Sequence, residues 1–442
     1  MTAGDGGDAV RAGHGPLGIL AGAGALPIEI AASVNVRGRA VHLVAIAGFA
    51  ENEIADFPHE WVTLGQIGGM LASFRRAGCR EIVIAGGLRR PDILRTRPDL
   101  GALRHMPTIL SLTRGGDDSL LRRVVRFFEG QGFIVRGAGE MAPELLAAGG
   151  PAGRRTPTDA ELHSVAKAAR AIRALGRFDV GQAAVATTDG VVAIETARGT
   201  DALLAVLAAG GAASGSGRGG VLVKLAKPGQ ELRVDLPAIG PRTIDGAVKA
   251  GLAGIAVEAG RTIVLERGAT RTAADEAGIF LYGLEEAVSS DLPPLADLAA
   301  MRPLSVLARR APTPRERRDN AIGRQLLDVM RREDLGRAAV IAGEHVLAVS
   351  GQLDVATMLR TLGRDAQWGR RWFRRRIGSL ALRLDGGEDS VLTLETFQAA
   401  ADARLAGIVC DGGTIPSARL AEVAGWANDA RMFLMAEVAD DA

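Results

Sequence analysis

The sequence predicts an α/β protein of three consecutive domains, and three observations support this. The chain has 442 residues, more than one ordinary domain contains. Between residues 17 and 86, short apolar runs alternate with amphipathic segments of helical length, which is typical of a parallel sheet covered by helices on both faces. A segment that starts at Asp179 recurs in altered form from Asp334, which indicates that one domain is repeated.

The first domain is predicted to be a Rossmann-like parallel-sheet domain over residues 16–150, after a disordered leader over residues 1–15. The apolar runs LGILA, AVHLVAI and EIVIAGG predict strands, and the segments IEIAASVNVRG and QIGGMLASFRRAG predict the helices between them. A further helix begins at Asp117 and leads to a strand in FIVRGA. The stretch AAGGPAGRRTPTD interrupts all periodicity, so the domain is expected to end there.

The second domain, an α/β domain over residues 151–290, is predicted to start with a helix after Thr158, because Glu161 stands at capping-box distance from it. Asp189-Gly190 predicts a hairpin turn between two apolar runs. The following segments predict the order helix, strand, loop, helix and then strands, in GTDALLAVLAAGG, VLVKL, KPGQELRVDLPAIGP, TIDGAVKAGLAG, IAVEAG and TIVLER, before the closing segment ADEAGIFLYGL.

The third domain, over residues 319–442, is predicted to be a degenerate repeat of the second, after a linker over residues 291–318. DLGRAAVIAGEHVLAV aligns with DVGQAAVATTDGVVAI, SLALRL with GVLVKL, and TFQAAADARLAGIVCDGG with TIDGAVKAGLAGIAVEAG. Apolar positions persist, but Glu195 and Asp201 become Ser350 and Ala356, and ungapped alignment leaves only Glu388 near Asp235. The repeat is therefore expected to keep a packing role and to lack the site.

Composition excludes several classes of function. The net charge is +2, and one Tyr and four Trp cannot supply the aromatic face that single-stranded nucleic acid needs, so no nucleic-acid partner is expected. The two cysteines lie far apart in apolar runs, which indicates unreactive buried thiols in a reducing compartment. No signal-like or membrane-length apolar stretch occurs, and a cytoplasmic protein is expected.

The loop between VLVKL and TIDGAVKAGLAG is the most informative part of the chain. It brings Lys224, Lys227, Gln230 and Arg233 together with one carboxylate, Asp235, in a Gly- and Pro-rich stretch, a composition typical of a phosphate site. A carboxylate in so apolar a loop is costly to bury without a partner or a function. The alternative is that Asp235 caps the helix that starts near Thr243.

Three further features are candidates for chemistry. The turn Gly22-Ala-Gly24 follows a strand and opens a helix, so it forms either a phosphate cradle or a tight turn without ligand. Asp117 and Asp118 either cap their helix or contact a metal or substrate. Arg89 follows the strand EIVIAGG, where a diphosphate could bind, or is a solvated surface residue.

Several catalytic classes lack their motifs. The Gly-x-Gly turn has Pro27 in place of the third glycine, and the next strand ends without an acidic residue, which excludes a nicotinamide cofactor. None of the six histidines has zinc-ligand spacing, and no Gly-x-Ser-x-Gly elbow occurs. What remains is attack by water on phosphorus, assisted by carboxylates and an oxygen-liganded cation such as Mg²⁺.

At these residues the chain resembles the LpxI-type UDP-2,3-diacylglucosamine pyrophosphatases of lipid A biosynthesis, over about Leu17 to Gly283. The matching motifs are GILAGAGALPIEIA, VTLGQIGGMLASFRRAGCREIVIAGGLRRP, Gly-Asp-Asp-x-Leu-Leu, DVGQAAV, GTDALL, KPGQELRVDLPAIGP and AGLAGIAVEAG. The resemblance implies a magnesium-dependent hydrolysis of UDP-2,3-diacylglucosamine to UMP and 2,3-diacylglucosamine 1-phosphate, with the substrate between two domains. The departures are Glu231 where the family has Asp, Ala238 where it commonly has Thr, and the C-terminal repeat.

The resemblance also implies roles for individual residues. Asp235 is expected to be catalytic and, with Asp117 and Asp118, to ligate Mg²⁺. The residues expected to bind substrate are Gly22, Gly24, Arg89, Gln182, Thr200, Asp201, Lys224, Lys227, Gln230, Thr243 and Glu258.

The acyl chains of the substrate imply transient contact with the inner-membrane surface, and the repeat predicts a monomer that contains an intramolecular pseudo-dimer. The alternative function is a catalytically inactive protein that binds a nucleotide-lipid.

Overall fold

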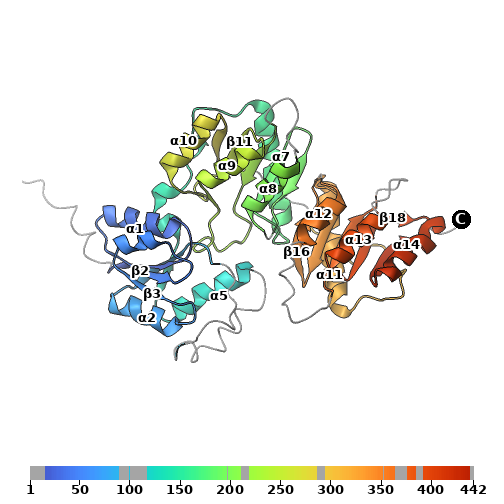
Figure 1. The fold of residues 1–442 in the computed structure, drawn as a ribbon, viewed down its shortest axis with the longest axis horizontal. Coiled ribbons are helices and arrows are strands. Elements are labelled where there is room, and N and C mark those ends of the chain that lie inside the picture. Colours follow the sequence, from blue (N-terminus) through green and yellow to red (C-terminus); the bar gives the residue numbers. More distant parts are fainter. Residues whose placement is uncertain are drawn as a thin grey trace, which may run out of the picture. The chain divides into compact units, whose positions relative to one another are not determined.

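A computed structural model describes residues 15–88, 99, 117–196, 198–210, 219–285, 294–351, 353–363, 376–384 and 392–438 (Figure 1). The chain forms two compact units, and two segments of the middle of the chain belong to the N-terminal one. Unit 1 consists of Met1–Gly149, Gly229–Pro241 and Glu258–Thr272, and unit 2 of Gly150–Pro228, Arg242–Val257 and Ala273–Ala442.

Unit 1 is built on a five-stranded sheet in the order β3-β2-β1-β4-β5, and its strand pairs are all parallel. The strands are β1 (Leu17–Ala21), β2 (Val41–Ile46), β3 (His59–Val62), β4 (Glu81–Ala85) and β5 (Ile134–Arg136). The helices are α1 (Leu26–Val36), α2 (Ile67–Arg76), α5 (Asp117–Gly130) and α6 (Ala138–Met141), with short 3₁₀ turns at Asn52–Asp56 and Pro143–Leu145. The prediction of a parallel α/β sheet is confirmed, although the sequence analysis missed the edge strand β3.

Helices cover both faces of this sheet, as Figure 1 shows. Successive side chains of each strand point to opposite faces, so the apolar strands have side chains to bury on both. On one face, Ile30 and Val34 of α1 pack with Leu17 and Ile19 of β1. On the other face, the buried side chains of α2 and α5 pack with Leu20 of β1 and with strand residues of β2 and β4. Two apolar cores therefore lie on opposite sides of one sheet, as in other doubly covered parallel sheets.

The first sheet of unit 2 has six strands in the order β6-β13-β11-β9-β7-β8. They are β6 (Gly150–Pro151), β7 (Ala183–Ala186), β8 (Val191–Ile194), β9 (Val221–Lys224), β11 (Gly254–Glu258) and β13 (Phe280–Leu284), with the helices α7 (Asp159–Gly176), α8 (Thr200–Gly210) and α9 (Pro241–Lys249). The helix α10 (Arg267–Ala277) begins in unit 1 and ends in unit 2. The predicted capping box is present, since Thr158 and Glu161 exchange hydrogen bonds of 2.8 and 3.3 Å. The predicted hairpin at Asp189-Gly190 is also present as β7 and β8, an antiparallel pair.

The second sheet of unit 2 has the corresponding order, β14-β19-β18-β17-β15-β16. Its strands are β14 (Ser305–Val306), β15 (Ala338–Ala342), β16 (His345–Val349), β17 (Ser379–Arg383), β18 (Gly407–Ile415) and β19 (Phe433–Val438), with the helices α11 (Pro314–Arg332), α12 (Val355–Gly363), α13 (Leu394–Asp402) and α14 (Ser417–Asp429). The antiparallel pairs β7–β8 and β7–β9 and the parallel pair β9–β11 each have a counterpart with the same direction.

The same arginine contacts recur in the two sheets at equivalent positions. Arg155 donates to the carbonyl of Ala253 and stacks over the Phe280 ring at 5.4 Å. Its counterpart Arg310 donates to the carbonyl of Ala406 and stacks over Phe433, also at 5.4 Å. Each arginine also binds the glutamate of its capping box at 2.6 Å. Such agreement among partly buried polar contacts goes well beyond a shared strand order.

The pairing registers correct one alignment made from the sequence. Gly254 of β11 pairs with Val221, and its counterpart Gly407 pairs with Ser379. SLALRL is therefore shifted by one residue from the match with GVLVKL, because Ser379 corresponds to Val221 and not to Gly220. In this register Leu382 replaces Lys224 and Arg383 replaces Leu225, so that the buried lysine of the first copy has an apolar counterpart.

Residues 291–318, expected to form a linker, contribute regular structure in their second half. Ser305 and Val306 form β14, which pairs antiparallel with β19. Thr313 caps α11, which begins at Pro314, and its capping box with Glu316 is complete. The proline-rich composition was compatible with this outcome because proline is favoured in the first turn of a helix.

The two sheets of unit 2 share one apolar core. This cluster contains Ile172 and Leu175 of α7 together with Leu326 and Met330 of α11. The helices α7 and α11 contact each other, and so do the edge strands β8 and β16. Arg170 of α7 forms an ion pair with Glu333 at the end of α11. The repeat is therefore joined to the first copy by a continuous interior, and equivalent elements face each other.

Close backbone packing yields a test of the repeat's core. A Cβ atom at Gly407 would overlap the Phe433 ring of the neighbouring strand, whereas a Cβ at Gly425 on α14 meets nothing within 4 Å. We expect Gly407→Ala to lower the free energy of unfolding by about 1–3 kcal/mol, because extra volume in a packed core forces side chains out of place. Gly425→Ala is the matched control and should be neutral or stabilising, since alanine favours helix. Urea unfolding measures both, and equal midpoints for the two variants would contradict the packing.

Candidate active site

The loop that carries Asp235 belongs to unit 1, where apolar neighbours fix it on both sides. Val234 packs against the core that α2 and α5 form, and Leu236 packs against the core under α1. A Cβ on Gly137, directly after β5, would lie 3.5 Å from the Cα of Arg233. The loop therefore lies beside the carboxyl end of β5, the edge of a parallel sheet at which α/β proteins bind ligands.

A second, short sheet also attaches the Asp235 loop to the first domain. The strands β10 (Ala238–Ile239) and β12 (Ile263–Val264) form a parallel pair. Ile263 is fully buried in the same core as α1, and Ala238 and Leu265 pack against that core. The two chain segments that cross from unit 2 into unit 1 are thus tied to each other and to the first domain.

Asp235 is oriented by a contact inside its own loop. Its Oδ2 accepts a hydrogen bond of 2.6 Å from Nε2 of Gln230, and Gln230 is only 8% exposed. The backbone N–H of Asp235 donates to the carbonyl of Glu231 at 3.1 Å. Because α9 begins at Pro241 and the carboxylate binds Gln230, the alternative role as a cap for that helix is not what the structure shows.

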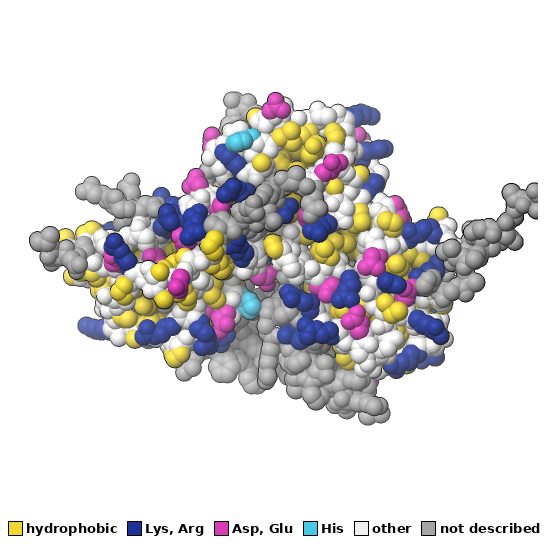
Figure 2. Space-filling view, turned by 180° about the vertical axis from the view of Figure 1, so that it is seen from behind, with side chains coloured by type: hydrophobic (Ala, Val, Ile, Leu, Met, Phe, Trp, Pro, Cys, Tyr) yellow, Lys and Arg dark blue, Asp and Glu magenta, His cyan; other side chains and the backbone are white. Residues whose placement is uncertain are grey.

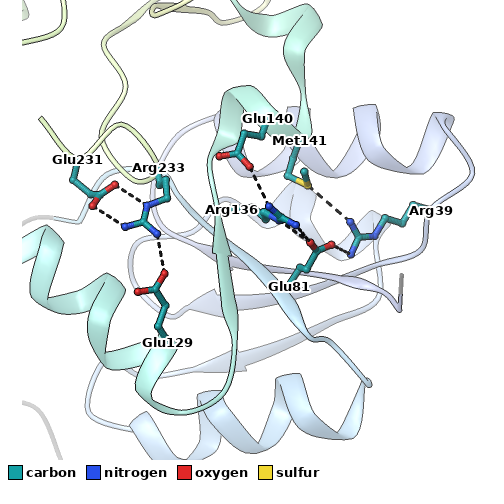
Figure 3. A network of polar contacts seen from close by, with 8 residues as sticks. All are labelled: Arg39, Glu81, Glu129, Arg136, Glu140, Met141, Glu231 and Arg233. Atoms are coloured by element: carbon teal, nitrogen blue, oxygen red, sulfur yellow. Dashed lines mark hydrogen bonds and ion pairs between the residues drawn. The ribbon is translucent and has the colours of Figure 1, made fainter. Parts of the chain in front are cut away.

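Arg233 braces the same loop against α5, as Figure 3 shows. Its guanidinium donates to both carboxylate oxygens of Glu231, at 2.8 and 2.9 Å, and to Glu129 of α5 at 2.8 Å. The hydrogen bonds from Arg233 hold the pKa of Glu231 below its ordinary value, and the charge of Arg122 lowers it further. The pKa of Arg233 is raised chiefly by Glu231. Glu231 is therefore a structural partner of Arg233.

A second network in Figure 3 centres on Glu81 of β4, and the sequence analysis missed it. Glu81 of β4 is 5% exposed and binds Arg39 at 2.7 Å and Arg136 at 2.6 Å. Burial alone would raise the pKa of Glu81, but the hydrogen bonds from Arg136 and Arg39 outweigh it and lower the pKa. The signal available in the sequence was a charged residue that opens an otherwise apolar strand.

The backbone N–H groups of the Gly22-Ala-Gly24 turn already donate hydrogen bonds within the chain. Gly22 N–H donates to the carbonyl of Ala85 and Ala23 N–H to that of Gly87, while Gly24 N–H donates to Oε1 of Glu51 at 3.0 Å. A Cβ at Gly22 would lie 2.8 Å from the carbonyl oxygen of Gly87, which explains the glycine by close backbone approach. These contacts favour the tight turn, since a phosphate there would have to displace Glu51.

In unit 2, a buried carboxylate links two of the predicted substrate residues. Glu195 is 5% exposed and accepts the backbone N–H of Gln182 at 2.7 Å and the hydroxyl of Thr200 at 2.9 Å. It therefore connects the start of β7 to the first turn of α8. The sequence analysis noted Glu195 only as a difference between the two copies, although a glutamate directly after an apolar strand was the available signal.

The other predicted residues of unit 2 fall into two groups. Lys224 at the end of β9 and Thr243 in the first turn of α9 are each 8% exposed. Lys227 forms an ion pair with Asp179, and Asp201 pairs with Arg242 at 2.9 Å on the surface.

Of the remaining predicted residues, Glu258 at the end of β11 belongs to unit 1 and lies 3.6 Å from Arg261. Four predictions rest on parts of the chain outside the described residues: Arg89, the side chains of Asp117 and Asp118, Glu388, and the disordered leader, of which only Gly15 is described.

The described residues contain no group of three or more His, Cys, Asp or Glu side chains that could hold a metal ion. They do supply the carboxylate of Asp235. Mg²⁺ keeps several waters and is usually bound through one or two carboxylates and substrate phosphates, so this donor set is compatible with it. Both cysteines are buried, and burial raises the pKa of the Cys79 thiol to about 11, which leaves it unreactive.

Basic and acidic side chains are interspersed on the face of the molecule that Figure 2 presents. This agrees with a net charge of +2. In the described part of the chain, no helix combines the length and the apolar character needed to cross a bilayer.

The fold and site define an α/β protein of two units in which one loop carries an oriented carboxylate to the edge of a parallel sheet. Comparison with known proteins then identifies the family. Residues 16–145 match the LpxI N-terminal domain and residues 148–282 the LpxI C-terminal domain. The chain is 40% identical over 272 residues to the UDP-2,3-diacylglucosamine pyrophosphatase LpxI of Caulobacter vibrioides, which covers 61% of this chain and 97% of that protein. The chain belongs to the LpxI family, and the repeat follows the matched ranges.

The ion pairs of Arg233 give a testable pH dependence. In Arg233→Met, we expect the pKa of Glu231 to rise toward its ordinary value, as measured by carboxyl-carbon NMR during an acid titration. Since the folded pKa lies below the unfolded one, the pair stabilises the loop above the unfolded pKa of Glu and loses its effect as pH falls through the folded pKa. Arg242→Met removes a surface ion pair of unit 2 and is the control. An unchanged titration of Glu231 in Arg233→Met would refute the assignment.

Proposed function

We propose that this protein hydrolyses UDP-2,3-diacylglucosamine to UMP and 2,3-diacylglucosamine 1-phosphate. The observation that carries the proposal is Asp235, which a buried glutamine orients at the carboxyl edge of the parallel sheet in a chain that belongs to the LpxI family. The relative from Caulobacter vibrioides is named for this pyrophosphatase activity. The lack of a serine, cysteine or histidine nucleophile motif in the sequence also favours direct attack by water.

In the proposed reaction, the oxygen of a water molecule forms a bond to one phosphorus of the diphosphate, and the bridging P–O bond breaks. The bridging oxygen leaves with the other phosphate, and the water's protons pass to the released phosphate groups and to solvent. Gln230 engages Oδ2 of Asp235, and we assign Oδ1 the contact to the attacking water or to the cation. Fixing the carboxylate before substrate arrives spares its reorganisation during the reaction.

We assign Mg²⁺ to Asp235 with Asp117 and Asp118. The contacts of α5 support this: Glu129 binds Arg233, and the charge of Arg122 acts on Glu231, so α5 runs beside the Asp235 loop. Asp118 stands four residues before Arg122, about one helical turn. When bound, the cation would neutralise charge that develops on the diphosphate. Lys224, Lys227 and Arg89 are proposed to supply the remaining counter-charge to the substrate.

The substrate carries two acyl chains, and this suggests where the enzyme works. We propose a cytoplasmic protein that meets the inner-membrane surface transiently, without inserting a helix into it. The apolar chains would require a water-excluding channel near the site, since burying them is favourable by about 0.8 kcal/mol for each methylene group.

The role of Asp235 can be tested directly. Asp235→Asn keeps the shape of the side chain, and we expect the rate of UMP release with Mg²⁺ to fall by about 100-fold or more, as happens when a group that stabilises the transition state is removed. Equilibrium binding of substrate should persist. Asp245→Asn, which alters an exposed aspartate of α9 paired with Lys249, is the control.

Two outcomes would contradict the proposal. A wild-type rate in Asp235→Asn would remove this residue from catalysis. If the unaltered protein binds UDP-2,3-diacylglucosamine yet releases no UMP, the inactive binding protein is the correct function, and Ala238 in place of the family's threonine is the first candidate cause.

We further propose that the C-terminal repeat arose by duplication and replaces a second subunit. In unit 2, α7 faces α11 and β8 faces β16, so each element meets its own counterpart. That is the arrangement of a self-complementary, two-fold interface. A shared core that includes Ile172 and Leu326 lies at this interface. The chain would then be a monomer whose two copies form a pseudo-dimer.

Light scattering tests this arrangement. The full chain should have the mass of a monomer, because the repeat covers the apolar face of α7 and β8. A shortened chain that ends at Leu284 uncovers that face, and we expect it to dimerise or aggregate. A shortened chain that stays monomeric, stable and active would show that the repeat has another purpose.

A further inference from the structure

The C-terminal repeat contains a cavity of about 530 Å³ at the edge of its sheet. Arg337 precedes β15 and Arg383 ends β17, and both line the cavity. Its walls also include Val355 at the start of α12 and Thr393, which caps α13. A volume of this size is typical of a site for a small molecule. The sequence analysis expected the repeat to have only a packing role, and the cavity points to more.

The cavity occupies the place in the repeat that predicted substrate residues occupy in the first copy. Leu225 N–H donates to the carbonyl of Gln182 at 2.9 Å, and Arg383 N–H donates in the same way to the carbonyl of Arg337 at 2.8 Å. Arg337 therefore corresponds to Gln182 and Arg383 to Leu225. By the same alignment, the cavity residues Val355, Ala356 and Thr396 correspond to three further predicted substrate residues, which are Thr200, Asp201 and Thr243.

The chemistry of this position has changed between the copies. The repeat places guanidinium groups where the first copy has an amide and an isobutyl group, and it replaces the buried Glu195 by Ser350. Arginine binds phosphate through two parallel hydrogen bonds, which suits it to oxyanions. The two helices that begin at the cavity, α12 and α13, have nine residues each, and their N-terminal dipoles add favourable potential for an anion.

Three carboxylates also line the cavity, and their local contacts account for two of them. Asp354 accepts the backbone N–H of Thr357 at 2.8 Å and so caps α12. Glu395 pairs with Arg360 at 3.0 Å. Asp334 is exposed, in a turn with φ 51°. Asp354 and Glu395 are thus committed to a helix terminus and to a cation, and an anion is the class of ligand that guanidinium groups in the lining favour.

We propose that this cavity is a second ligand site, which binds a small molecule through a phosphate group held by Arg337 and Arg383. It is separate from Asp235, which belongs to unit 1. The repeat would then have exchanged the first copy's substrate for another phosphorylated compound while it kept the same fold.

The experiment titrates inorganic pyrophosphate into the full chain at constant ionic strength and follows binding by calorimetry. Arg337→Gln/Arg383→Leu installs the residues that the first copy carries at the same positions, so the backbone should accommodate them. We expect this variant to bind pyrophosphate about tenfold or more weakly at one site, the effect of losing charged hydrogen bonds. Arg318→Ala, on α11 and with its partner Glu344 outside the cavity lining, is the control and should bind as the wild type does.

Thermal unfolding without ligand establishes that the double variant is folded. Unchanged affinity in the folded double variant overturns the proposal, and so does the absence of pyrophosphate binding to the wild type. Release of UMP from UDP-2,3-diacylglucosamine is measured on the same samples. We expect the double variant to release UMP at the wild-type rate. If the proposed hydrolysis is wrong, the wild type itself releases no UMP, whereas an error in the proposed ligand site shows in the pyrophosphate affinities of the two proteins.

Discussion

The packing of Val234 and Leu236 is the constraint on which the candidate site depends. Val234, in a turn, packs against the core that α2 and α5 form, and Leu236 packs against the core under α1, so the two neighbours of Asp235 are held in the cores on the two faces of one sheet. Asp235 lies between these anchors, so the carboxylate cannot shift without disturbing apolar packing on both faces. Gln230 and Arg233 then fix what packing leaves undetermined, which is the orientation of the carboxylate and the position of the loop beside α5. Pre-organisation of this kind is where most electrostatic catalysis originates.

Local patterns predicted much of this fold because local energies decide it. The capping box at Thr158 and the Asp189-Gly190 turn formed as expected, since each depends on neighbours within a few residues. The edge strand β3 and the strand β14 were missed, because a short edge strand has little burial to give it a periodic pattern. The sequence singled out the Asp235 loop as the candidate site, but its place in unit 1 was not predicted, because that place depends on contacts between residues far apart in sequence, such as Arg233 with Glu129, 104 residues away.

The two copies in unit 2 differ in a physically selective way. Features that burial or backbone conformation enforces recur in both, such as the arginine stacked on a buried phenylalanine and the aspartates with positive φ at Asp179 and Asp334. Changing any of them alone would leave a buried group unpaired or strain the chain. The polar residues at the ends of the strands, such as Gln182 and Lys224, are the ones that diverged, while the strand pairing beneath them is unchanged. Sequence divergence at those positions therefore says little about fold and a great deal about ligand.

This distinction also explains how a repeat can gain a site instead of only losing one. Replacing Gln182 by its counterpart Arg337 leaves the backbone hydrogen bond to the next strand in place, because that bond uses the carbonyl group and not the side chain. The strand ends and helix starts remain where a parallel pair and its helices place them, and that edge favours anions whatever the neighbouring side chains are. A few substitutions on this edge are therefore sufficient to change the charge of the lining, whereas abolishing the cavity would require repacking of the core beneath it. Preserved architecture and altered side chains together are the expected outcome when a duplicated domain is retained for a new ligand.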